Sequence, residues 1–340
     1  MWVPTWFPGS PLRNSLLILD PPAHTRVRAL AQRAFGPRAM AILESRSRAI
    51  AAELTGRLAA DREIDLINDF AIALPGRIII EICGLDPGLQ VHFKRWGAAV
   101  AAMGISDPAL IAQVRTDFEE MIRHLRAVVE ERRRHPADDI VTELLEPDPT
   151  TGDRMTDDEV LAFLATILPA GFETSAGLLA NVLRFLALRP QDFSHLRARP
   201  EFIPQYLEEV LRYEPVAQTV ARICQTEVEV AGVRLAAGSV VLVLVGSANR
   251  DETKFPDPDV FDPDRFAPGK EGAKHLSFSH GIHYCLGAAL ARAECRIGIE
   301  ALLARCEQLR MGPAPIEWTM SLSVRIPVSL PARLSRRLAA

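Results

Sequence analysis

The 340-residue chain lacks the features that mark several large classes of protein. It has 20 Gly and 25 Pro but no collagen-like repeat, and its 48% hydrophobic content excludes intrinsic disorder. None of its five cysteines forms a C-x-x-C pair, which argues against a disulfide framework and favours a reducing compartment. A net charge of -4 gives no basic field that would attract nucleic acid or an anionic membrane.

Sorting signals, linkers and membrane spans are also missing. The first ten residues have neither the basic region nor the apolar core of a signal peptide. No Gly/Ser-rich or Pro-rich linker divides the chain, so residues 1–340 are expected to form a single domain. The most apolar stretch, residues 160–183, is interrupted by Glu173, so no membrane span is expected. We therefore predict a soluble, cytoplasmic protein.

Hydrophobic periodicity predicts a mainly α protein with a small antiparallel β portion. Residues 37–188 repeat apolar positions every three or four residues, and further helices are expected over 204–214 and 287–309. Residues 226–245 alternate apolar and polar side chains between glycine-containing turns, which is typical of short antiparallel strands. Residues 251–272 are so rich in Pro and Asp that an ordered but irregular segment is expected.

Glu173 is the first anomaly, because a carboxylate stands in the middle of a helix that otherwise has the composition of a core. Three neighbours weaken the same turn. Pro169 removes a backbone donor, Gly171 costs about 1 kcal/mol relative to Ala, and Thr174 can bond back to a carbonyl one turn earlier. The pattern indicates either a functional site or a kinked core helix in which Glu173 reaches solvent or an arginine.

Cys285 is the second anomaly, because a loop containing Gly281 places it just before a predicted helix whose first turn contains Gly287. Backbone N–H groups at a helix start favour a thiolate. Three roles compete on these residues alone: a buried structural cysteine, a zinc site with His280 and His283, or a single axial thiolate to heme iron. The thiolate role also explains the glycines.

A third feature is the pair Glu209 and Arg212, which lie three residues apart on one face of a short helix. Alone, such a pair is usually an exposed ion pair. Arg265, at the end of the irregular segment, could join the same carboxylate in a buried, hydrogen-bonded network.

Taken together, the motifs resemble those of the cytochrome P-450 family, the heme-thiolate monooxygenases, in its soluble bacterial form. The resemblance covers nearly the whole chain, and six motifs in the family's order make it specific. These are DPPAHTRVR from Asp20, AGFETS from Ala170, EEVLR from Glu208, ANRD from Ala248, FDPDRF from Phe261 and FSHGIHYCLG from Phe278.

The resemblance implies a P-450 fold that binds heme b, with Cys285 as the axial iron ligand. Glu173 and Thr174 match the family's catalytic acid and alcohol, and Glu209, Arg212 and Arg265 match its buried structural triad. The residues that it assigns to the heme pocket are His24, Arg28, Ala170, Gly171, Arg222, Phe278, Gly281, His283 and Gly287. Of these, His24, Arg28, Arg222 and His283 would hold the two heme propionates.

Two departures from the family pattern stand out. Ser279 occupies a loop position where glycine is most common. In addition, the family's chains usually carry dozens of residues, including a first helix and much of a sheet, before the motif that starts here at Asp20. The expected fold is therefore an N-terminally shortened form, in which later strands would lack their usual partners.

The implied reaction is oxygen insertion into an apolar small molecule of secondary metabolism, with electrons from a ferredoxin or flavodoxin. No G-x-G-x-x-G follows a predicted strand, so the chain has no visible nicotinamide or flavin site. The alternatives are a peroxide-driven peroxygenase, which Glu173 and Thr174 disfavour, and a non-catalytic heme-binding or partner-binding module. The expected pocket walls are Trp6, Phe7, Leu164, Ile167, Leu168 and residues 216–219, with Gln218 and Thr219 as orienting groups.

Overall fold

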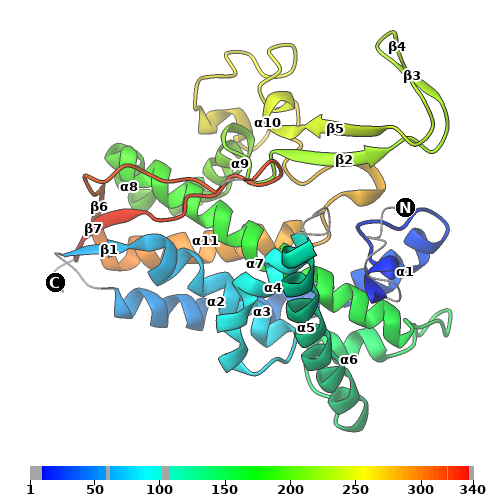
Figure 1. The fold of residues 1–340 in the computed structure, drawn as a ribbon. Coiled ribbons are helices and arrows are strands. Elements are labelled where there is room, and N and C mark those ends of the chain that lie inside the picture. The colour runs from blue at the N-terminus through cyan, green and yellow to red at the C-terminus, as the bar shows by residue number, and fades with distance from the viewer. Residues whose placement is uncertain (1–9, 59–61, 102–107, 320, 337–340) are drawn as a thin grey trace. The chain divides into compact units, whose positions relative to one another are not determined.

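The computed structural model describes residues 10–58, 62–101, 108–319 and 321–336. Helices dominate it, as the sequence predicts, and every strand pair within these residues is antiparallel (Figure 1). The helices are α1 (Ala23–Arg33), α2 (Pro37–Arg57), α3 (Ala73–Ile82), α4 (Phe93–Ala101), α5 (Pro108–Arg134), α6 (Ile140–Leu145), α7 (Asp157–Leu188), α8 (Pro190–Ala198), α9 (Ile203–Tyr213), α10 (Val245–Ala248) and α11 (Ala288–Arg305). The strands are β1 (Glu63–Asp65), β2 (Thr219–Ile223), β3 (Val228–Val230), β4 (Val233–Leu235), β5 (Val240–Leu244), β6 (Cys306–Met311) and β7 (Pro331–Arg336).

The chain forms two compact units, each of which is built from several segments. The first contains residues 1–57, 69–176 and 286–301, and the second contains residues 58–68, 177–285 and 302–340. Helices α7 and α11 contribute residues to both units. The single domain expected from the sequence stays a prediction.

The first unit is helical, and its core is formed by the apolar faces of α2 to α5 together with the first part of α7. Helix α7 begins with a capping box in which Thr156 and Glu159 exchange backbone-to-side-chain hydrogen bonds of 2.8 and 3.3 Å. Phe93 of α4 packs edge-on against Phe172 of α7, with ring centroids 5.9 Å apart. These contacts position the middle of α7 against its neighbours.

Helix α7 is the longest element that the structure describes. Within the described residues it is the one helix that is long and apolar enough to cross a membrane, and 67% of its most apolar 18-residue window is buried. Pro169 lies inside it, and Glu173 interrupts the apolar run as expected. Its burial is that of a core helix, which is why its composition is so apolar.

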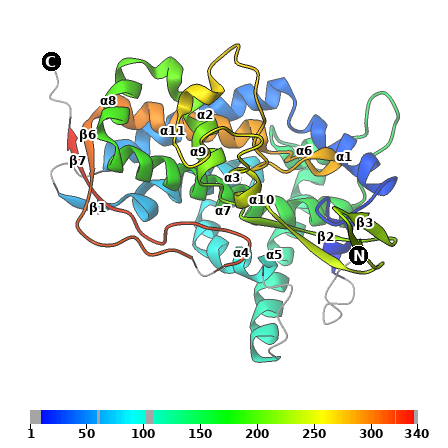
Figure 2. The same cartoon turned by 90° about the horizontal axis from the view of Figure 1, so that it is seen from above.

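The second unit combines α8 and α9 with small sheets. Strands β1, β7 and β6 form one sheet in that order, while β2 pairs with β5 and β3 pairs with β4. Figure 1 and Figure 2 both show β2 beside β5, with the β3–β4 hairpin continuing beyond their ends. The irregular segment over residues 251–272 is confirmed, apart from the single turn η5 (Pro263–Phe266).

Two boundaries predicted from the sequence are wrong. Helix α11 ends at Arg305 instead of continuing to residue 309, because residues from Cys306 form strand β6 and pair with β7. The predicted strands over 226–245 are present as β3, β4 and β5, but β5 pairs with an additional strand, β2, which starts earlier at Thr219. In both cases hydrogen bonds to a strand elsewhere in the chain determine the boundary, and the local spacing of apolar residues cannot predict them.

Candidate functional site

The turn of α7 that contains Glu173 and Thr174 is open on one side. Ala170 and Thr174, four residues apart and therefore on one face, are exposed, whereas Phe172 and Ser175 beside them are buried. Glu173 is half-buried. The Thr174 hydroxyl donates to the Ala170 carbonyl at 2.5 Å, which confirms the predicted bond to the preceding turn. A buried helix thus presents one polar, accessible turn.

Gly171 serves close packing in the same turn. A Cβ at this position would lie 2.8 Å from Cδ1 of Ile79 in α3, closer than any side chain tolerates without movement. Pro169 lies one helical turn before Glu173 and supplies no backbone N–H. The glycine therefore lets α3 approach the turn, and its expected place in the heme pocket stays a prediction.

A buried carboxyl that no sequence motif indicates, that of Glu294, lies beside this turn. Glu294 of α11 is 3% exposed and receives a hydrogen bond from the Ser175 hydroxyl. Its Oε2 has no hydrogen-bond partner among the described residues. Burial raises the pKa of Glu294 from its usual 4.5 to about 8, although the Ser175 hydrogen bond acts in the opposite direction. Burial therefore favours the neutral form of Glu294, whose carboxyl is hydrogen-bonded to Ser175, the residue that follows Thr174 in the chain.

Cys285 lies at the end of a tight loop. Its backbone N–H donates to the Phe278 carbonyl at 2.9 Å, which closes the loop, and the residue is half-buried. Gly281 starts the turn η6 (Gly281–His283). Its φ is +72°, a backbone conformation that favours glycine. Ser279 has a φ of +63°, a conformation that glycine adopts more easily than other residues. This explains why glycine is most common at this position.

The stem of this loop is fixed by a buried side chain that the ANRD motif contains. Asn249 donates through Nδ2 to the Ser277 hydroxyl at 2.9 Å and accepts through Oδ1 from the Leu276 N–H at 2.7 Å. The Ser277 hydroxyl donates in turn to the Leu211 carbonyl of α9 at 2.6 Å. Loop and helix are thereby tied together. Asn249 is thus a positioning residue that sequence analysis named only as part of a motif.

The residues expected to hold the propionates belong to different units, and each pair is described within its own unit. In the second unit, Arg222 is exposed on β2 and donates to the Ser279 hydroxyl at 3.3 Å, while His283 is half-buried in the loop. In the first unit, His24 is buried and Arg28 half-buried, four residues apart on one face of α1. Each pair offers donors suited to a carboxylate.

The Glu209 cluster, which we define as Glu209, Arg212 and Arg265, consists of a buried ion pair and a half-buried arginine. Glu209 and Arg212 have fully buried side chains and form two hydrogen bonds of 2.7 Å each. Arg265 lies 3.7 Å from the same carboxylate, which also accepts from the Asp262 N–H at 2.7 Å. Arg212 further donates to three backbone carbonyls, those of Asn249, Pro258 and Val260. The cluster joins α9 to the irregular segment and to the residues that hold the cysteine loop.

The residues of the cysteine loop fit a thiolate-bound heme better than the zinc alternative. Within the described ranges, no group of three or more His, Cys, Asp or Glu side chains is arranged to hold a metal ion. A Cβ added at Gly281 or Gly287 would meet nothing within 4 Å, so both glycines border open space. In the second unit, the half-buried thiol of Cys285 would supply one soft iron ligand. The exposed Arg222, which binds the same loop through Ser279, would supply a partner for one carboxylate.

The residues expected to form the pocket walls differ in burial, and two of them lie outside the described ranges. Trp6 and Phe7 lie outside the described residues. Leu164 and Leu168 are buried and Ile167 is half-buried. The two expected orienting side chains already bind backbone carbonyls. Gln218 donates to Pro215 at 2.5 Å, and Thr219 donates to Leu322 at 3.0 Å. The Thr219 oxygen can still accept a hydrogen bond, and the Gln218 amide keeps its oxygen and a second N–H, so both could still contact a substrate.

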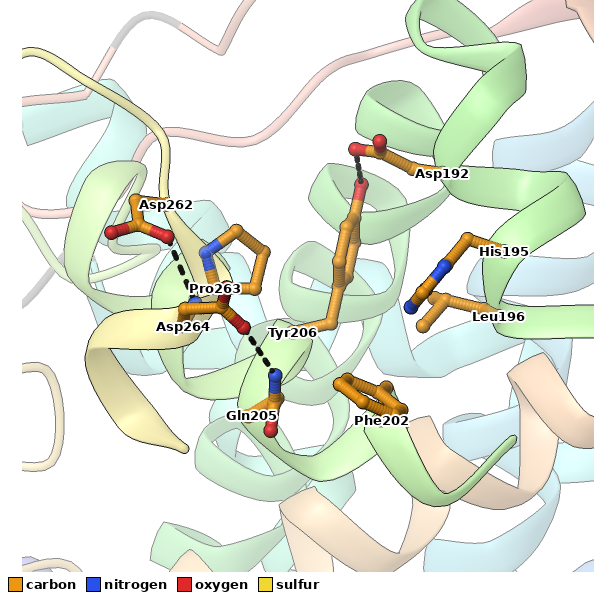
Figure 3. A pocket seen from close by; sticks show the side chains of 9 residues that line it. All are labelled: Asp192, His195, Leu196, Phe202, Gln205, Tyr206, Asp262, Pro263 and Asp264. Atoms are coloured by element: carbon orange, nitrogen blue, oxygen red, sulfur yellow. Dashed lines mark hydrogen bonds between the residues drawn. The ribbon is translucent and has the colours of Figure 1, made fainter. Parts of the chain in front are cut away.

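A separate cavity of about 180 Å³ lies between α8, α9 and η5 in the second unit (Figure 3). Its polar groups bind one another: Tyr206 donates to Asp192 at 3.2 Å, Gln205 donates to Asp264 at 3.1 Å, and the Asp262 carboxylate accepts from the Asp264 N–H at 3.0 Å. These hydrogen bonds pair the polar side chains of the cavity with one another, so their presence there has a structural explanation. None of the predicted site residues lines the cavity.

Comparison with known proteins points to one family. A family model described as Cytochrome P450 matches residues 108–327. Cytochrome P450 107B1 of Saccharopolyspora erythraea is 38% identical over 94% of this chain and 76% of the relative. Cyclomarin C epoxidase CymV of Salinispora arenicola is 36% identical over 93% of the chain and 80% of the relative. The 6-deoxyerythronolide B hydroxylase of Saccharopolyspora erythraea is 34% identical over 93% of the chain and 76% of the relative.

Solved structures agree with these sequence matches. Cytochrome P450 CYP109Q5 from Chondromyces apiculatus superposes with a TM-score of 0.84 at 38% identity, covering 96% of this chain and 80% of that one. CYP109E1 from Bacillus megaterium in complex with testosterone has a TM-score of 0.84 at 33% identity, covering 94% and 86%. The expected fold is thereby confirmed.

Proposed function

Because the chain belongs to the cytochrome P450 family, it is a heme-dependent monooxygenase, and we propose that Cys285 is the thiolate that binds the heme iron. Heme b, when bound, supplies the activation of dioxygen and the insertion of one oxygen atom into the substrate. The cysteine loop carries the proposal. It holds the sulfur half-buried beside two glycines that border open space, and helix α11 begins three residues later.

Four residues of the family motifs would bind the heme propionates, because they offer charged or hydrogen-bonding groups suited to carboxylates. They are Arg222 and His283 of the second unit and His24 and Arg28 of the first. The remaining residues that the family motifs assign to the heme pocket are small or flat, which suits a planar group, although Gly171 also serves packing against α3. They are Ala170, Gly171, Phe278, Gly281 and Gly287.

Thr174 and Glu173 would donate and relay protons. The Thr174 hydroxyl is exposed and needs only a rotation about χ1 to leave the Ala170 carbonyl and donate elsewhere. The neighbouring carboxylate of Glu173 can take a proton from water and return it. Pro169 and Gly171 weaken the turn, so this rearrangement disturbs few helix hydrogen bonds.

Glu294 would keep the buried side of this turn uncharged. Burial raises the pKa of its carboxyl to about 8, and the carboxyl accepts a hydrogen bond from Ser175, the residue that follows Thr174 in the chain. Glu173 is only half-buried, so the two carboxyls would differ in role because they differ in burial.

Bacterial proteins of this kind act on small molecules and receive electrons from redox partner proteins. We propose an apolar substrate of secondary metabolism, a class to which several relatives' names point, among them the 6-deoxyerythronolide B hydroxylase. We also propose a ferredoxin or flavodoxin as the electron donor and the cytoplasm as the location, since the relatives are bacterial proteins and this chain shows no flavin motif of its own.

Substitution of Thr174 tests the proposal through coupling, the amount of product formed per reducing equivalent consumed. In Thr174→Ala, heme uptake and substrate affinity should stay close to those of the unmodified protein, while coupling falls at least tenfold and hydrogen peroxide rises, since a general-acid contribution is typically about 10²–10⁴-fold. Thr166→Ala is the matched control. Thr166 lies in the same helix and bonds back to the Ala162 carbonyl at 2.7 Å, yet it should leave coupling unchanged.

Two results would contradict the assignment. Unchanged coupling in Thr174→Ala would make Thr174 a helix-packing residue. Failure of the unmodified protein to form product with any electron donor, together with normal heme binding, would favour a binding module over an enzyme.

A further inference from the structure

His275 is a buried histidine in the segment that leads to the cysteine loop. Its side chain is 4% exposed. The imidazole contacts the rings of Phe266 and Phe278, with centroids 5.9 and 6.0 Å away. A buried imidazole has two ring nitrogens that both need hydrogen-bond partners, so the partners of His275 show what the ring connects.

Both ring nitrogens of His275 have partners, and the partners fix which nitrogen carries the proton. The Ser277 backbone N–H lies 3.2 Å from Nδ1, and because an N–H can only donate, Nδ1 is the acceptor. Nε2 therefore carries the proton and donates to the Glu208 carboxylate of α9 at 3.2 Å. The rigid ring thus forms a bridge from α9 to the backbone of Ser277.

This bridge acts on the part of the chain that closes the cysteine loop. Ser277 is also held through its hydroxyl, which donates to the Leu211 carbonyl at 2.6 Å. Glu208 and Leu211 lie three residues apart on α9, so two neighbouring positions of this helix hold the segment. The next residue, Phe278, accepts the Cys285 N–H at 2.9 Å. A shift of Ser277 would therefore be passed through Phe278 to the backbone of Cys285.

We infer that His275 is a positioning residue for the Cys285 sulfur, which it holds in place by connecting Glu208 to Ser277. The inference rests on the proposed function of Cys285 as the iron ligand. A ligand has to be held within about 0.5 Å of its productive position, and a ring that accepts on one side and donates on the other fixes the spacing between helix and loop.

His275→Phe tests the bridge, because phenylalanine keeps an aromatic ring and removes both hydrogen bonds. The reduced, heme-loaded protein with carbon monoxide is titrated with urea. Absorbance follows the red-shifted Soret band of thiolate ligation, and circular dichroism follows helix content. Near the midpoint of band loss, the ratio of thiolate-bound to thiolate-free complex should fall about two- to tenfold for each bond removed, while helix loss stays at the same urea concentration.

His275→Asn and His275→Gln each keep one of the two bonds. Asparagine places an oxygen where Nδ1 was, so it accepts from the N–H two residues later, as in an Asx turn. Glutamine places an amide nitrogen at the reach of Nε2 and can donate to Glu208. Both variants should fall between the unmodified protein and His275→Phe.

His195→Phe is the matched control, because His195 belongs to the same unit and also contacts a phenylalanine ring, that of Phe202, with centroids 5.0 Å apart. It lies in α8, outside the cysteine loop, and its substitution should leave the ratio unchanged.

An unchanged ratio in His275→Phe would overturn the inference. Band loss and helix loss that shift together would also overturn it, because His275 would then stabilise the whole unit and not the position of the sulfur. Absence of the red-shifted band from the unmodified protein would refute the proposed function and, with it, this inference.

Discussion

The Glu209 cluster and the Thr174 turn hold their polar groups in opposite ways. Glu209 is fully buried, and its carboxylate is surrounded by two arginines and a backbone N–H. Thr174 is exposed, and its hydroxyl is held only by the carbonyl of its own helix. Buried polar groups stabilise a fold when all their partners are fixed, whereas a group that takes part in chemistry needs a partner it can leave. The first region is built for structure and the second for reaction.

The largest expected effect comes from removing one member of the Glu209 cluster. Glu209→Ala leaves the Arg212 guanidinium buried without its carboxylate, which should lower the free energy of unfolding by about 3–5 kcal/mol and reduce heme content. Denaturant unfolding and heme absorbance measure both. Glu201→Ala removes an exposed ion pair with Arg199 and should cost less than about 1 kcal/mol. Equal losses in the two variants would show that the cluster is no more important than a surface pair.

A pH-dependent effect of intermediate size should come from Glu294. Its folded-state pKa of about 8 lies above the usual 4.5, so the folded protein retains a proton that the unfolded chain loses between these values. The contribution of Glu294 is fully present below about pH 4.5 and falls as the pH rises toward 8, with a limiting slope of about 1.4 kcal/mol per pH unit.

Glu294→Gln isolates this dependence, because the amide keeps the shape of the neutral acid. Relative to the unmodified protein, the variant should gain stability as the pH rises from 5 to 8, on the order of a few kcal/mol in total. Melting temperatures across this range measure it. Glu307→Gln, at an exposed position, should show no such trend. Parallel pH profiles for Glu294→Gln and the unmodified protein would mean that Glu294 is ionised in the folded state.

The smallest expected effect lies in the cysteine loop. Ser279 has a φ of +63°, a conformation that costs a side chain about 1–2 kcal/mol and glycine little. Ser279→Gly should therefore change stability by less than about 1 kcal/mol, since the greater freedom of glycine in the unfolded chain offsets part of the gain. Ser279→Val should destabilise by more, because a branched side chain tolerates this backbone least. Thermal unfolding that ranks Val as the most stable of the three would show that the loop differs from the one described.

Local signals account for what the sequence predicts well. Helix positions follow from apolar spacing, and the Cys285 loop and the Glu209 cluster follow from motifs whose residues lie close together in the chain or recur in a known family. Strand β6 was missed because the apolar spacing of α11 continues past Arg305, and only pairing with the distant β7 ends the helix. Glu294 was missed for a related reason, since its burial, which raises its pKa, and its hydrogen bond from Ser175 depend on residues that lie far from it in the chain.

The complex of the reduced protein with carbon monoxide tests the central assignment most directly, because its absorbance reports whether a thiolate is bound opposite the gas. We expect the unmodified protein to show the strongly red-shifted Soret band of thiolate ligation. Cys285→Ala should lose this band, while Cys224→Ala, which replaces another half-buried cysteine of the same unit, should keep it. A red-shifted band that survives in Cys285→Ala, or disappears in Cys224→Ala, would contradict the assignment of Cys285 as the iron ligand.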